Sequence, residues 1–438
     1  MTQGRERKAD IIVVGGGAAG MMAAGQAAGQ GARVVLLEKM KRTGLKIGIS
    51  GKGRCNLTNV ADLENFLSHF GKNGRFLRQA FHRFFAPELI GFFEGLGLPL
   101  ITERGGRVFP ESGRALDVVK VLRSWLDRQD VRMIKAAPVT ELLIRERKIA
   151  GVACGQRRFM ANTIILATGG ASYPATGSSG DGYRLARQAG HAIVPIRPAL
   201  VPLETETGLV RELNGLHLRN IGVRLRINGK TAATLFGELK FYDHGLTGPV
   251  ILTLSLAAVD GLRAGNRVEI LLDLKPALDQ KQLDARLCRD LERRCHENME
   301  SVLRGLLPRQ LVQVCLRGTG IQSNQQAGQL PRKARKRLGQ WLKRWTIPIT
   351  DHRGLDEAIV TAGGVRLAEI DPRTMQSRLC TGLYIAGELL DLAGDTGSYN
   401  LQAAFSTGWL AGQNAHSLHK GNPPKSCGKN ISDAPKTS

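Results

Sequence analysis

Three glycines near the start of the chain, Gly15, Gly17 and Gly20, have the spacing that binds the pyrophosphate of a dinucleotide. The first permits a tight turn, the second lets backbone N–H groups approach the phosphates, and the third lets a helix pack closely on a strand. Glu38 follows about twenty positions later, where an acid accepts hydrogen bonds from ribose hydroxyls. The pattern predicts a dinucleotide site, and the alternative is a glycine-rich turn that binds nothing. The predicted contacts are Gly15, Gly17, Ala18, Ala19, Gly20, Glu38 and Lys39.

The elements that must position this motif form a strand–helix–strand unit. Residues 9–14 are a short apolar run between charged residues and glycines, as is typical of a buried parallel strand. Residues 21–30 suit a helix, and residues 33–37 suit the next strand, which ends at the acid. The spacing therefore predicts a complete βαβ unit.

Two later segments are expected near the same ligand. An apolar run at 162–167 leads into Thr168, Gly169 and Gly170, and it resembles the strand that passes close to the cofactor in two-dinucleotide-fold flavoproteins. Val139 follows a basic strand at 132–135. Two interpretations of this valine stay open, since it either presents its backbone to the adenine or only packs in the core.

The composition sets the class of protein. A chain of 438 residues with 42% hydrophobic content is long enough for two or three domains with proper cores. The apolar stretches are too short to span a bilayer, and the apolar start is better explained by the nucleotide motif than by a signal peptide. We therefore expect no membrane association.

The cysteines indicate a reducing compartment. They form no CxxC pair and no metal-ligand cluster, which argues against a disulfide reductase and against a metal site. An odd number of cysteines without a secretory signal favours the cytoplasm. The seven are Cys55, Cys154, Cys288, Cys295, Cys315, Cys380 and Cys427.

Four segments together carry a family resemblance. They are residues 43–59 (TGLKIGISGKGRCNLTN), 243–249 (DHGLTGP), 361–365 (TAGGV) and 386–402, which contains AGE and YNLQ. In these segments the chain resembles the BaiN/YhiN/RdsA family of flavoproteins, sometimes labelled aminoacetone-oxidase-like, from about residue 9 to 415. One departure is Gly397-Ser398, where many members have paired glycines before the Tyr-Asn.

The resemblance implies an α/β fold with a Rossmann-like, two-dinucleotide-binding FAD domain that is doubly wound and split in sequence. The FAD domain would take residues 1–190 and 346–418. A β-rich domain at 191–275 and a basic helical domain at 276–345 would be inserted, and 419–438 would be a disordered tail. Further FAD contacts implied by the matched motifs are Lys46, Ser50, Gly51, Gly53, Arg54, Asn56, Gly387, Glu388, Asn400 and Leu401.

Local patterns within the insertion agree with this division. Residues 223–227 and 268–272 alternate as strands do, and Asn228-Gly229 reads as a turn. Leucines then recur at helical spacing. They are Leu283, Leu287 and Leu291, followed by Leu303, Leu307 and Leu311.

The charge points to a polyanionic partner. Lysine and arginine total 62 against 38 acids, for a net charge of +24, and residues 281–345 contain 15 basic and 5 acidic residues. Basic residues interleaved with Trp341 and Trp345 suit phosphate contacts with base stacking, and the alternative is a solvated helix face whose tryptophans turn inward. The predicted RNA-binding residues are Arg332, Lys333, Arg335, Lys336, Arg337, Lys343 and Arg344.

This charge selects among the activities that the resemblance implies. These are a ribosomal RNA dihydrouridine synthase, a reductase of conjugated double bonds in steroid-like acids, and an amine oxidase. Because only the first requires a polyanion, we expect reduction of the C5=C6 bond of a uridine in 23S rRNA or a ribosome assembly intermediate. The alternatives are a reductase of small conjugated enones, an amine oxidase, and an RNA-binding protein that keeps FAD as structure.

Such a reduction needs a hydride source and a general acid. NAD(P)H is expected to visit the flavin transiently, because the chain has no second complete glycine motif. Cys55 is the first candidate for the acid, since Arg54 and Lys52 beside it would lower the pKa of its thiol. His244 and Tyr399 are the alternatives, and the cysteine is otherwise a small buried residue.

Overall fold

The computed structural model describes residues 9–419, which form two units. Unit 1 comprises residues 9–196 and 363–419, and unit 2 comprises residues 197–362. Strands β11 (Ile193–Ala199) and β19 (Val360–Val365) carry the chain across the two boundaries and pair with each other. All but the first residue of the predicted tail lies outside the described residues.

Unit 1 is built on a five-stranded parallel sheet in the order β20-β10-β1-β2-β6. Every residue of β1, β2 and β10 is buried, because helices cover a parallel sheet on both faces. The last strand of the chain pairs with β10, so the returning segment completes the sheet and confirms the split Rossmann-like fold. The strands are β1 (Ile11–Val14), β2 (Val34–Leu37), β6 (Arg132–Ile134), β10 (Thr163–Leu166) and β20 (Leu383–Ile385).

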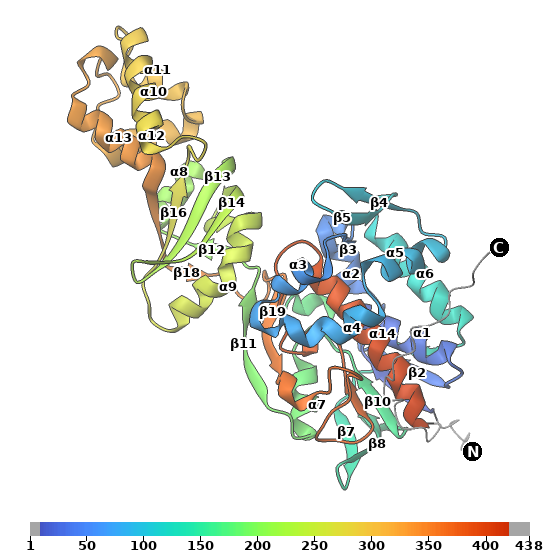
Figure 1. The fold of residues 1–438 in the computed structure, drawn as a ribbon. Helices are drawn as coiled ribbons and strands as arrows, with labels where there is room; N and C mark the ends of the chain where they lie inside the picture. Colours follow the sequence, from blue (N-terminus) through green and yellow to red (C-terminus); the bar gives the residue numbers. More distant parts are fainter. Residues whose placement is uncertain (1–8, 420–438) are drawn as a thin grey trace, which may run out of the picture. The chain divides into compact units, whose positions relative to one another are not determined.

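Helices α1 (Ala18–Gly29) and α14 (Tyr399–His419) lie side by side on this sheet (Figure 1). Gly408 and Gly412 permit their close approach, since a Cβ at these positions would lie 2.3 and 2.4 Å from carbonyl oxygens of Ala19 and Ala23. The first helix begins at Ala18 rather than at the predicted residue 21, directly after the glycine loop. Its N-terminus therefore faces the loop itself.

The remaining elements of unit 1 surround this layer. Asp62 caps α3 by accepting a hydrogen bond from the Asn65 N–H. The helices are α2 (Leu45–Ile49), α3 (Leu63–Ser68), α4 (Arg78–Arg83), α5 (Ala86–Gly95), α6 (Ala115–Arg128) and α7 (Asp181–Gln188). Two small antiparallel sheets consist of β3 (Thr58–Asn59), β4 (Leu100–Glu103) and β5 (Arg107–Pro110), and of β7 (Glu141–Arg145), β8 (Lys148–Cys154) and β9 (Arg157–Met160).

Unit 2 contains a seven-stranded antiparallel sheet in the order β17-β16-β13-β14-β15-β12-β18. The predicted strands at 223–227 and 268–272 are confirmed as parts of β13 and β16. The turn at Asn228-Gly229 is confirmed as well, and both residues have the positive φ that a tight hairpin requires. The strands are β12 (Leu203–Glu204), β13 (His217–Ile227), β14 (Lys230–Tyr242), β15 (Gly245–Thr247), β16 (Val268–Asp273), β17 (Trp345–Ile349) and β18 (Asp351–His352).

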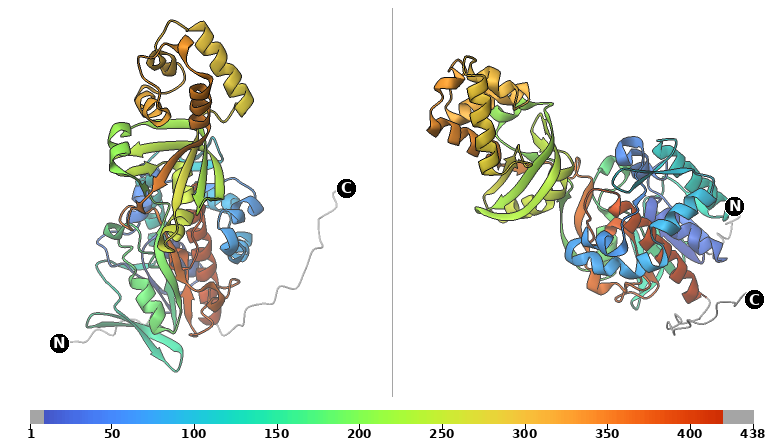
Figure 2. Two further views of the ribbon diagram at one scale, coloured as in Figure 1. Left: turned by 90° about the vertical axis from the view of Figure 1, so that its left-hand side faces the viewer. Right: turned by 45° about the horizontal axis from the view of Figure 1, so that its top comes forward.

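The helices of unit 2 agree only in part with the leucine pattern. Leu283, Leu287 and Leu291 form the buried face of α10, as predicted. The later leucines do not share one helix, because Pro308 separates α11 from α12. The helices are α8 (Thr207–Leu213), α9 (Pro249–Arg263), α10 (Gln280–Arg293), α11 (Met299–Arg304), α12 (Arg309–Thr319) and α13 (Arg332–Arg344), and Figure 2 shows the last four gathered at one end of the sheet.

Three predicted boundaries differ from the structure. The first unit boundary lies at 196/197 instead of 190/191, and the second lies at 362/363 instead of 345/346. The second moves because β17 pairs with β16, and β18 with β12, so both strands complete the sheet of unit 2. The boundary at 275/276 is absent, since the sheet and the four helices share one hydrophobic core. None of the helices in the described part is long and apolar enough to cross a membrane.

Candidate functional site

The glycine loop of unit 1 is packed tightly on the sheet side and open in front of α1. Gly15 has φ +105°, and a Cβ there would lie 2.5 Å from the Ala167 carbonyl oxygen. A Cβ at Gly20 would lie 1.8 Å from the Gly15 oxygen, whereas a Cβ at Gly17 would meet nothing within 4 Å. No side chain caps the first N–H groups of α1. These groups and the positive end of the helix dipole are therefore free to bind phosphate.

Glu38 ends β2 with its carboxylate held toward the loop. The carboxylate accepts hydrogen bonds from the backbone N–H groups of Gly16 and Met40, both at 2.7 Å. The N–H of Ala137 donates to the Glu38 carbonyl oxygen, which brings the segment before Val139 to the same place. The Val139 side chain is buried in the core, and the contact of its backbone with adenine stays a prediction.

Two buried hydroxyls beside the loop lack a hydrogen-bond partner in the described residues. They belong to Thr43 and to Thr168, which follows β10 and whose hydroxyl lies against Gly182 of α7, since a Cβ there would be 1.9 Å from it. A Cβ at Gly16 would lie 2.7 Å from the Thr43 methyl group, so this threonine borders the loop. Buried polar atoms are nearly always paired, and an unpaired one in a protein without its ligand indicates where a polar ligand binds. Thr43 belonged to the family motif, but we did not single it out from the sequence.

A cluster of three side chains joins distant segments beside α1. The Lys46 ammonium donates to Ser172 Oγ at 2.6 Å and to Glu388 Oε2 at 2.8 Å, and Ser172 donates to Glu388 Oε1 at 3.0 Å. Gly387 lies against the first turn of α1, since a Cβ there would be 2.8 Å from the Ala19 Cβ. The predicted contacts Lys46, Gly387 and Glu388 are thus brought together with the glycine loop.

The predicted contacts Lys39, Gly169 and Gly170 lie on the segment that follows β10 or close to it. The Lys39 ammonium forms an ion pair with Asp181 at 2.7 Å and donates to Ser179. Gly169 has φ +74°, and the carbonyl oxygen of Gly170 accepts from the Gly180 N–H. These contacts hold the turn after β10 in place beside the acid that ends β2.

The loop from Ser50 to Asn56 is unusual because four of its residues have a left-handed backbone. Gly51 and Gly53 adopt it without strain, whereas Lys52 and Cys55, at φ 58° and 56°, do so at a cost of about 1–3 kcal/mol each. The N–H of Cys55 donates to the Ser50 carbonyl oxygen at 3.0 Å, which holds this geometry. Backbone strain of this kind collects at ligand sites.

The expectation that neighbouring cations lower the pKa of the Cys55 thiol is wrong. The thiol is fully buried, and burial raises its pKa to about 12, an effect that a hydrogen bond with Ser50 only partly offsets. Arg54 points elsewhere, because its guanidinium pairs with Glu103 and lies 4.3 Å from the centre of the Phe109 ring. Cys55 is thus placed as a neutral, inert thiol.

The loop is tied to the segment that precedes α14. The Asn56 amide nitrogen donates to Ser398 Oγ at 2.8 Å. Asn400 exchanges two hydrogen bonds with the backbone of Gly394, both at 2.8 Å. Leu401 packs against the core of unit 1. The motif at residues 43–59 is thus connected to the motif at residues 386–402. The first motif contains the predicted contact Asn56, and the second contains Asn400 and Leu401.

Tyr399 lies beside a histidine that sequence reasoning missed. Its ring stacks on His69 at 3.8 Å between centroids and 21° between planes. Burial and the nearby Asp395 carboxylate raise the pKa of Tyr399. His69 Nδ1 lies 2.8 Å from Asp395 Oδ2. No local signal marks His69, because its partners are far away in the chain.

His244 belongs to unit 2. It is exposed at the turn between β14 and β15 of unit 2, with its ring edge against Tyr242 at 6.0 Å between centroids. Cys55 and Tyr399 belong to unit 1. In the described part of the chain, no three His, Cys, Asp or Glu side chains come together as metal ligands.

A family model described as HI0933-like protein Rossmann domain matches residues 9–414. The chain belongs to the HI0933-like family. Over 92% of its length it is 34% identical to a 3-dehydro-bile acid delta(4,6)-reductase of Clostridium scindens, of which it covers 98%. It is 30% identical over 92% of its length to a ribosomal RNA dihydrouridine synthase of Escherichia coli, of which it covers 97%.

Solved structures agree on the fold of this HI0933-like chain. A quinol fumarate reductase of E. coli superposes with a TM-score of 0.52 at 19% identity, over 94% of this chain and 71% of that one. A 3-ketosteroid-delta4-(5alpha)-dehydrogenase of Rhodococcus jostii gives 0.51 at 15% identity, over 95% and 98%. The chain is therefore an FAD-dependent oxidoreductase by family, as predicted. The open loop, the acid and the unpaired hydroxyls fit FAD.

The basic helix of this HI0933-like protein divides into structural and exposed cations. Arg335 pairs with Asp284 at 2.9 Å, Arg337 donates to the Thr319 carbonyl oxygen at 3.0 Å, and Lys343 pairs with Asp273 at 2.6 Å. The side chains of the other four predicted RNA-binding residues are exposed and form no hydrogen bond or ion pair with any residue that the structure describes, although two of them, Arg332 and Lys336, help to lower the pKa of Asp284. These four exposed α13 cations are Arg332, Lys333, Lys336 and Arg344.

The tryptophans of α13 and β17 belong to the core. Trp345 is buried between Trp341 and Phe241, at 5.0 and 5.8 Å between ring centroids. Trp341 is partly buried and packs against the same core. The interpretation of these rings as a base-stacking surface is wrong, because α13 is amphipathic and turns its apolar side inward.

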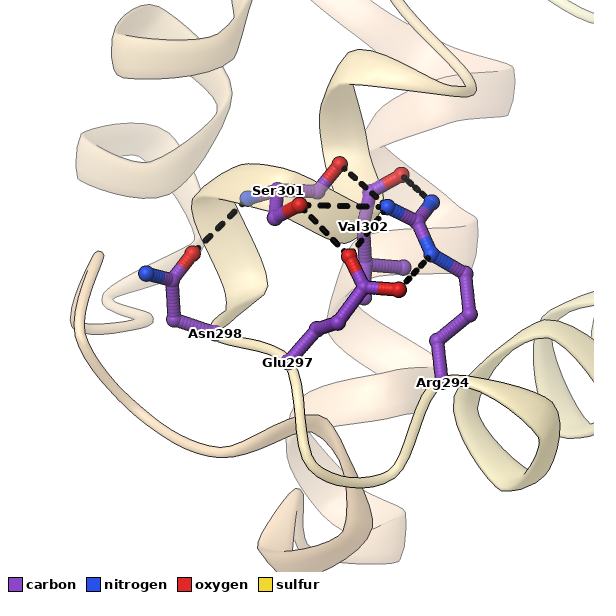
Figure 3. Close-up of polar contacts among 5 residues, drawn as sticks. All are labelled: Arg294, Glu297, Asn298, Ser301 and Val302. Carbon is purple, nitrogen blue, oxygen red and sulfur yellow. Dashed lines mark hydrogen bonds and ion pairs between the residues drawn. The ribbon is translucent and has the colours of Figure 1, made fainter.

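One further arginine of the basic region has a structural role. Figure 3 shows the Arg294 guanidinium between Glu297 and the backbone of α11. Arg294 Nε donates to Glu297 Oε1 at 2.7 Å, and its terminal nitrogens donate to the carbonyl oxygens of Ser301 and Val302. The hydrogen bonds from Arg294 and Ser301 lower the pKa of Glu297 to about 2. This arginine fastens the end of α10 to α11, so its charge is not available to a ligand.

Proposed function

We propose that this chain reduces the C5=C6 bond of a uridine in 23S rRNA, with FAD as its cofactor and NAD(P)H as a transient reductant. The observation that carries the proposal is the set of four exposed α13 cations on a chain that also holds a flavin site. Relatives named ribosomal RNA dihydrouridine synthase, in E. coli and Haemophilus influenzae, support it at 30% and 28% identity.

The chemistry assigns separate tasks to the cofactor and the protein. FAD, when bound and reduced, supplies the hydride. The N-terminus of α1 would bind the cofactor's phosphates, and Glu38 would orient its ribose. The protein must also supply a proton, because addition of a hydride to C6 leaves a carbanion at C5 that is stabilised by the neighbouring carbonyl group.

The exposed α13 cations suit an RNA substrate in which the target uridine is stacked between neighbouring bases. Extruding a base costs a few kcal/mol. Phosphate contacts offset this cost through counterion release, and they make the affinity depend on salt. Because the tryptophans of this region are buried, these cations would position the RNA backbone and would not read its sequence.

A second candidate is the reduction of a small conjugated enone. The 34% identity to the bile-acid reductase of C. scindens favours it. The two reactions share their chemistry, since each adds a hydride and a proton across a carbon–carbon double bond conjugated with a carbonyl. They differ in whether the substrate is a polyanion.

An anaerobic half-reaction separates the two candidates. The bound flavin is reduced with NADPH or NADH and then mixed with unmodified 23S rRNA or with a steroid enone. Reoxidation by the RNA, together with a uridine heavier by two hydrogens in mass spectrometry, is the expected result. Reoxidation by the enone alone would assign the chain to the small-molecule reductases.

A further inference from the structure

His69 and Asp395 form a pair at the surface of unit 1 beside Tyr399. The imidazole Nδ1 lies 2.8 Å from the carboxylate, and the Asp395 N–H donates to the His69 carbonyl oxygen at 3.2 Å. The side chains are 28% and 34% exposed, so a ligand can reach them. The Tyr399 ring stacks on the imidazole and fixes its plane. The histidine is thus held by three contacts from one segment of the chain.

The pair occupies Nδ1 of the His69 ring and leaves Nε2 available to a substrate. An ionised carboxylate only accepts hydrogen bonds, so Nδ1 carries a hydrogen and donates it to Asp395. Nε2 makes no hydrogen bond with any residue that the structure describes. This is the arrangement in which a carboxylate orients an imidazole for proton transfer through the other nitrogen.

Hydrogen bonds and close packing connect the segment that carries Asp395 to the predicted FAD contacts. Gly387 lies against the first turn of α1, Glu388 reaches Lys46, and the segment then continues to Asp395. Asn56, from the strained loop, is bonded to Ser398 of the same segment. The Asn400 amide donates to the Asp395 carbonyl oxygen at 3.3 Å, so the pair adjoins one of the predicted FAD contacts.

We propose that His69 is the proton donor of the reduction and that Asp395 is its positioning residue. The inference rests on the proposed function, and it applies to a uridine and to an enone alike. FAD, when bound and reduced, would supply a hydride to one alkene carbon, and the electron pair left on the other carbon would take the Nε2 proton of the His69 imidazolium, while its Nδ1–H stays bonded to Asp395. The Nε2–H bond breaks as the C–H bond forms, and the neutral imidazole regains a proton from solvent.

The first test measures the protonation of the two nitrogens of the His69 ring. Imidazole ¹⁵N shifts of the holoenzyme over a pH series, assigned by comparison with His69→Gln, report which ring nitrogens carry a proton. We expect a protonated Nδ1 in the wild type and a changed proton distribution in Asp395→Asn. An unchanged spectrum in Asp395→Asn would overturn the positioning role, since this readout is independent of turnover.

The second test separates the two half-reactions. His69→Gln should be reduced by NAD(P)H at the wild-type rate, and its reoxidation by substrate should be slower by about 10²–10⁴-fold, the usual contribution of a general acid. His82→Gln is the matched control, because His82 is exposed on α4 and forms no ion pair within the described residues. Both of its half-reactions should be unchanged.

The outcomes distinguish the inference from the proposed function. If wild-type enzyme is reoxidised by RNA or enone and His69→Gln is equally fast, the inference alone fails. If reduced wild-type enzyme reacts with neither compound, the proposed function and the inference fail together. Restored reoxidation of His69→Gly by added imidazole would support the proton transfer and exclude a purely structural effect.

Discussion

The exposed α13 cations give the sharpest test of RNA binding. We consider the replacement of Arg332, Lys333, Lys336 and Arg344 by glutamine. These side chains are exposed and form no hydrogen bond or ion pair among the described residues, so the protein should fold normally. Arg335, Arg337 and Lys343 are left in place, because their contacts hold the helix and their loss would combine unfolding with lost binding.

The magnitude follows from counterion release. Each lost phosphate contact lowers the slope of log affinity against log salt by roughly 0.7 for single strands and 0.9 for duplexes. Four contacts therefore remove about 2.8–3.6 from the slope. Between about 50 and 200 mM salt, the affinity of the wild type should fall by roughly 50- to 150-fold more than that of the variant.

A matched control removes the same charge elsewhere. Glutamine replacements at four exposed cations of unit 1 lower the net charge by the same amount, from +24 to +20. The control positions are Arg83, Arg104, Arg128 and Arg132. Fluorescence anisotropy of a labelled 23S rRNA fragment over a salt series measures the slopes. Equal losses of slope in the two variants, or no loss in the α13 variant, would refute a docking role for this helix.

Three further predictions concern unit 1. Gly20→Ala should prevent the nucleotide loop from folding, because its Cβ would meet the Gly15 backbone. Gly17→Ala should fold, because its Cβ would meet nothing within 4 Å, but it should lose most of its FAD. Flavin absorbance of the purified proteins measures the loss. Burial raises the pKa of the Cys55 thiol to about 12, so Cys55 should resist iodoacetamide at about pH 8 in the native protein and react only in urea. Rapid alkylation of the native protein would contradict this burial. His191 is buried between Glu369 and Ser377, and burial lowers its pKa, so the unfolded chain binds the proton more readily than the native one. The stabilisation from neutral His191 is therefore present above about pH 6.5 and lost as the pH falls through the native pKa, and urea midpoints should decline less with acid in His191→Gln than in the wild type.

The sequence predicted the nucleotide-binding part of the fold closely. The strand before the glycines, the helix after them and the acid at residue 38 all lie within one short stretch, so their geometry depends on neighbouring residues. The helix α9 was missed, since it lies in a region where strands alternate and its start is marked only by Gly248-Pro249. The helical pattern across Leu303–Leu311 was extended too far, because Pro308 interrupts it.

The candidate site was predicted less completely. Residues carried by motifs, such as Lys46 and Glu388, were identified and lie together. The sequence left open whether Trp345 faces a bound base or turns inward, and the structure buries it beside Trp341 and Phe241. The basic residues of α13 looked alike in sequence, and only their partners distinguish structural cations from exposed ones.

By itself, the sequence determined the dinucleotide motif, the family and the excess of positive charge, because these depend on residue types and on short spacings along the chain. Only the tertiary structure decided that Cys55 is a buried thiol with a raised pKa and that His69 is paired with a carboxylate 326 positions away. The physical reason is that the protonation and reactivity of a side chain depend on its burial and on its partners. Both are created when distant segments pack together.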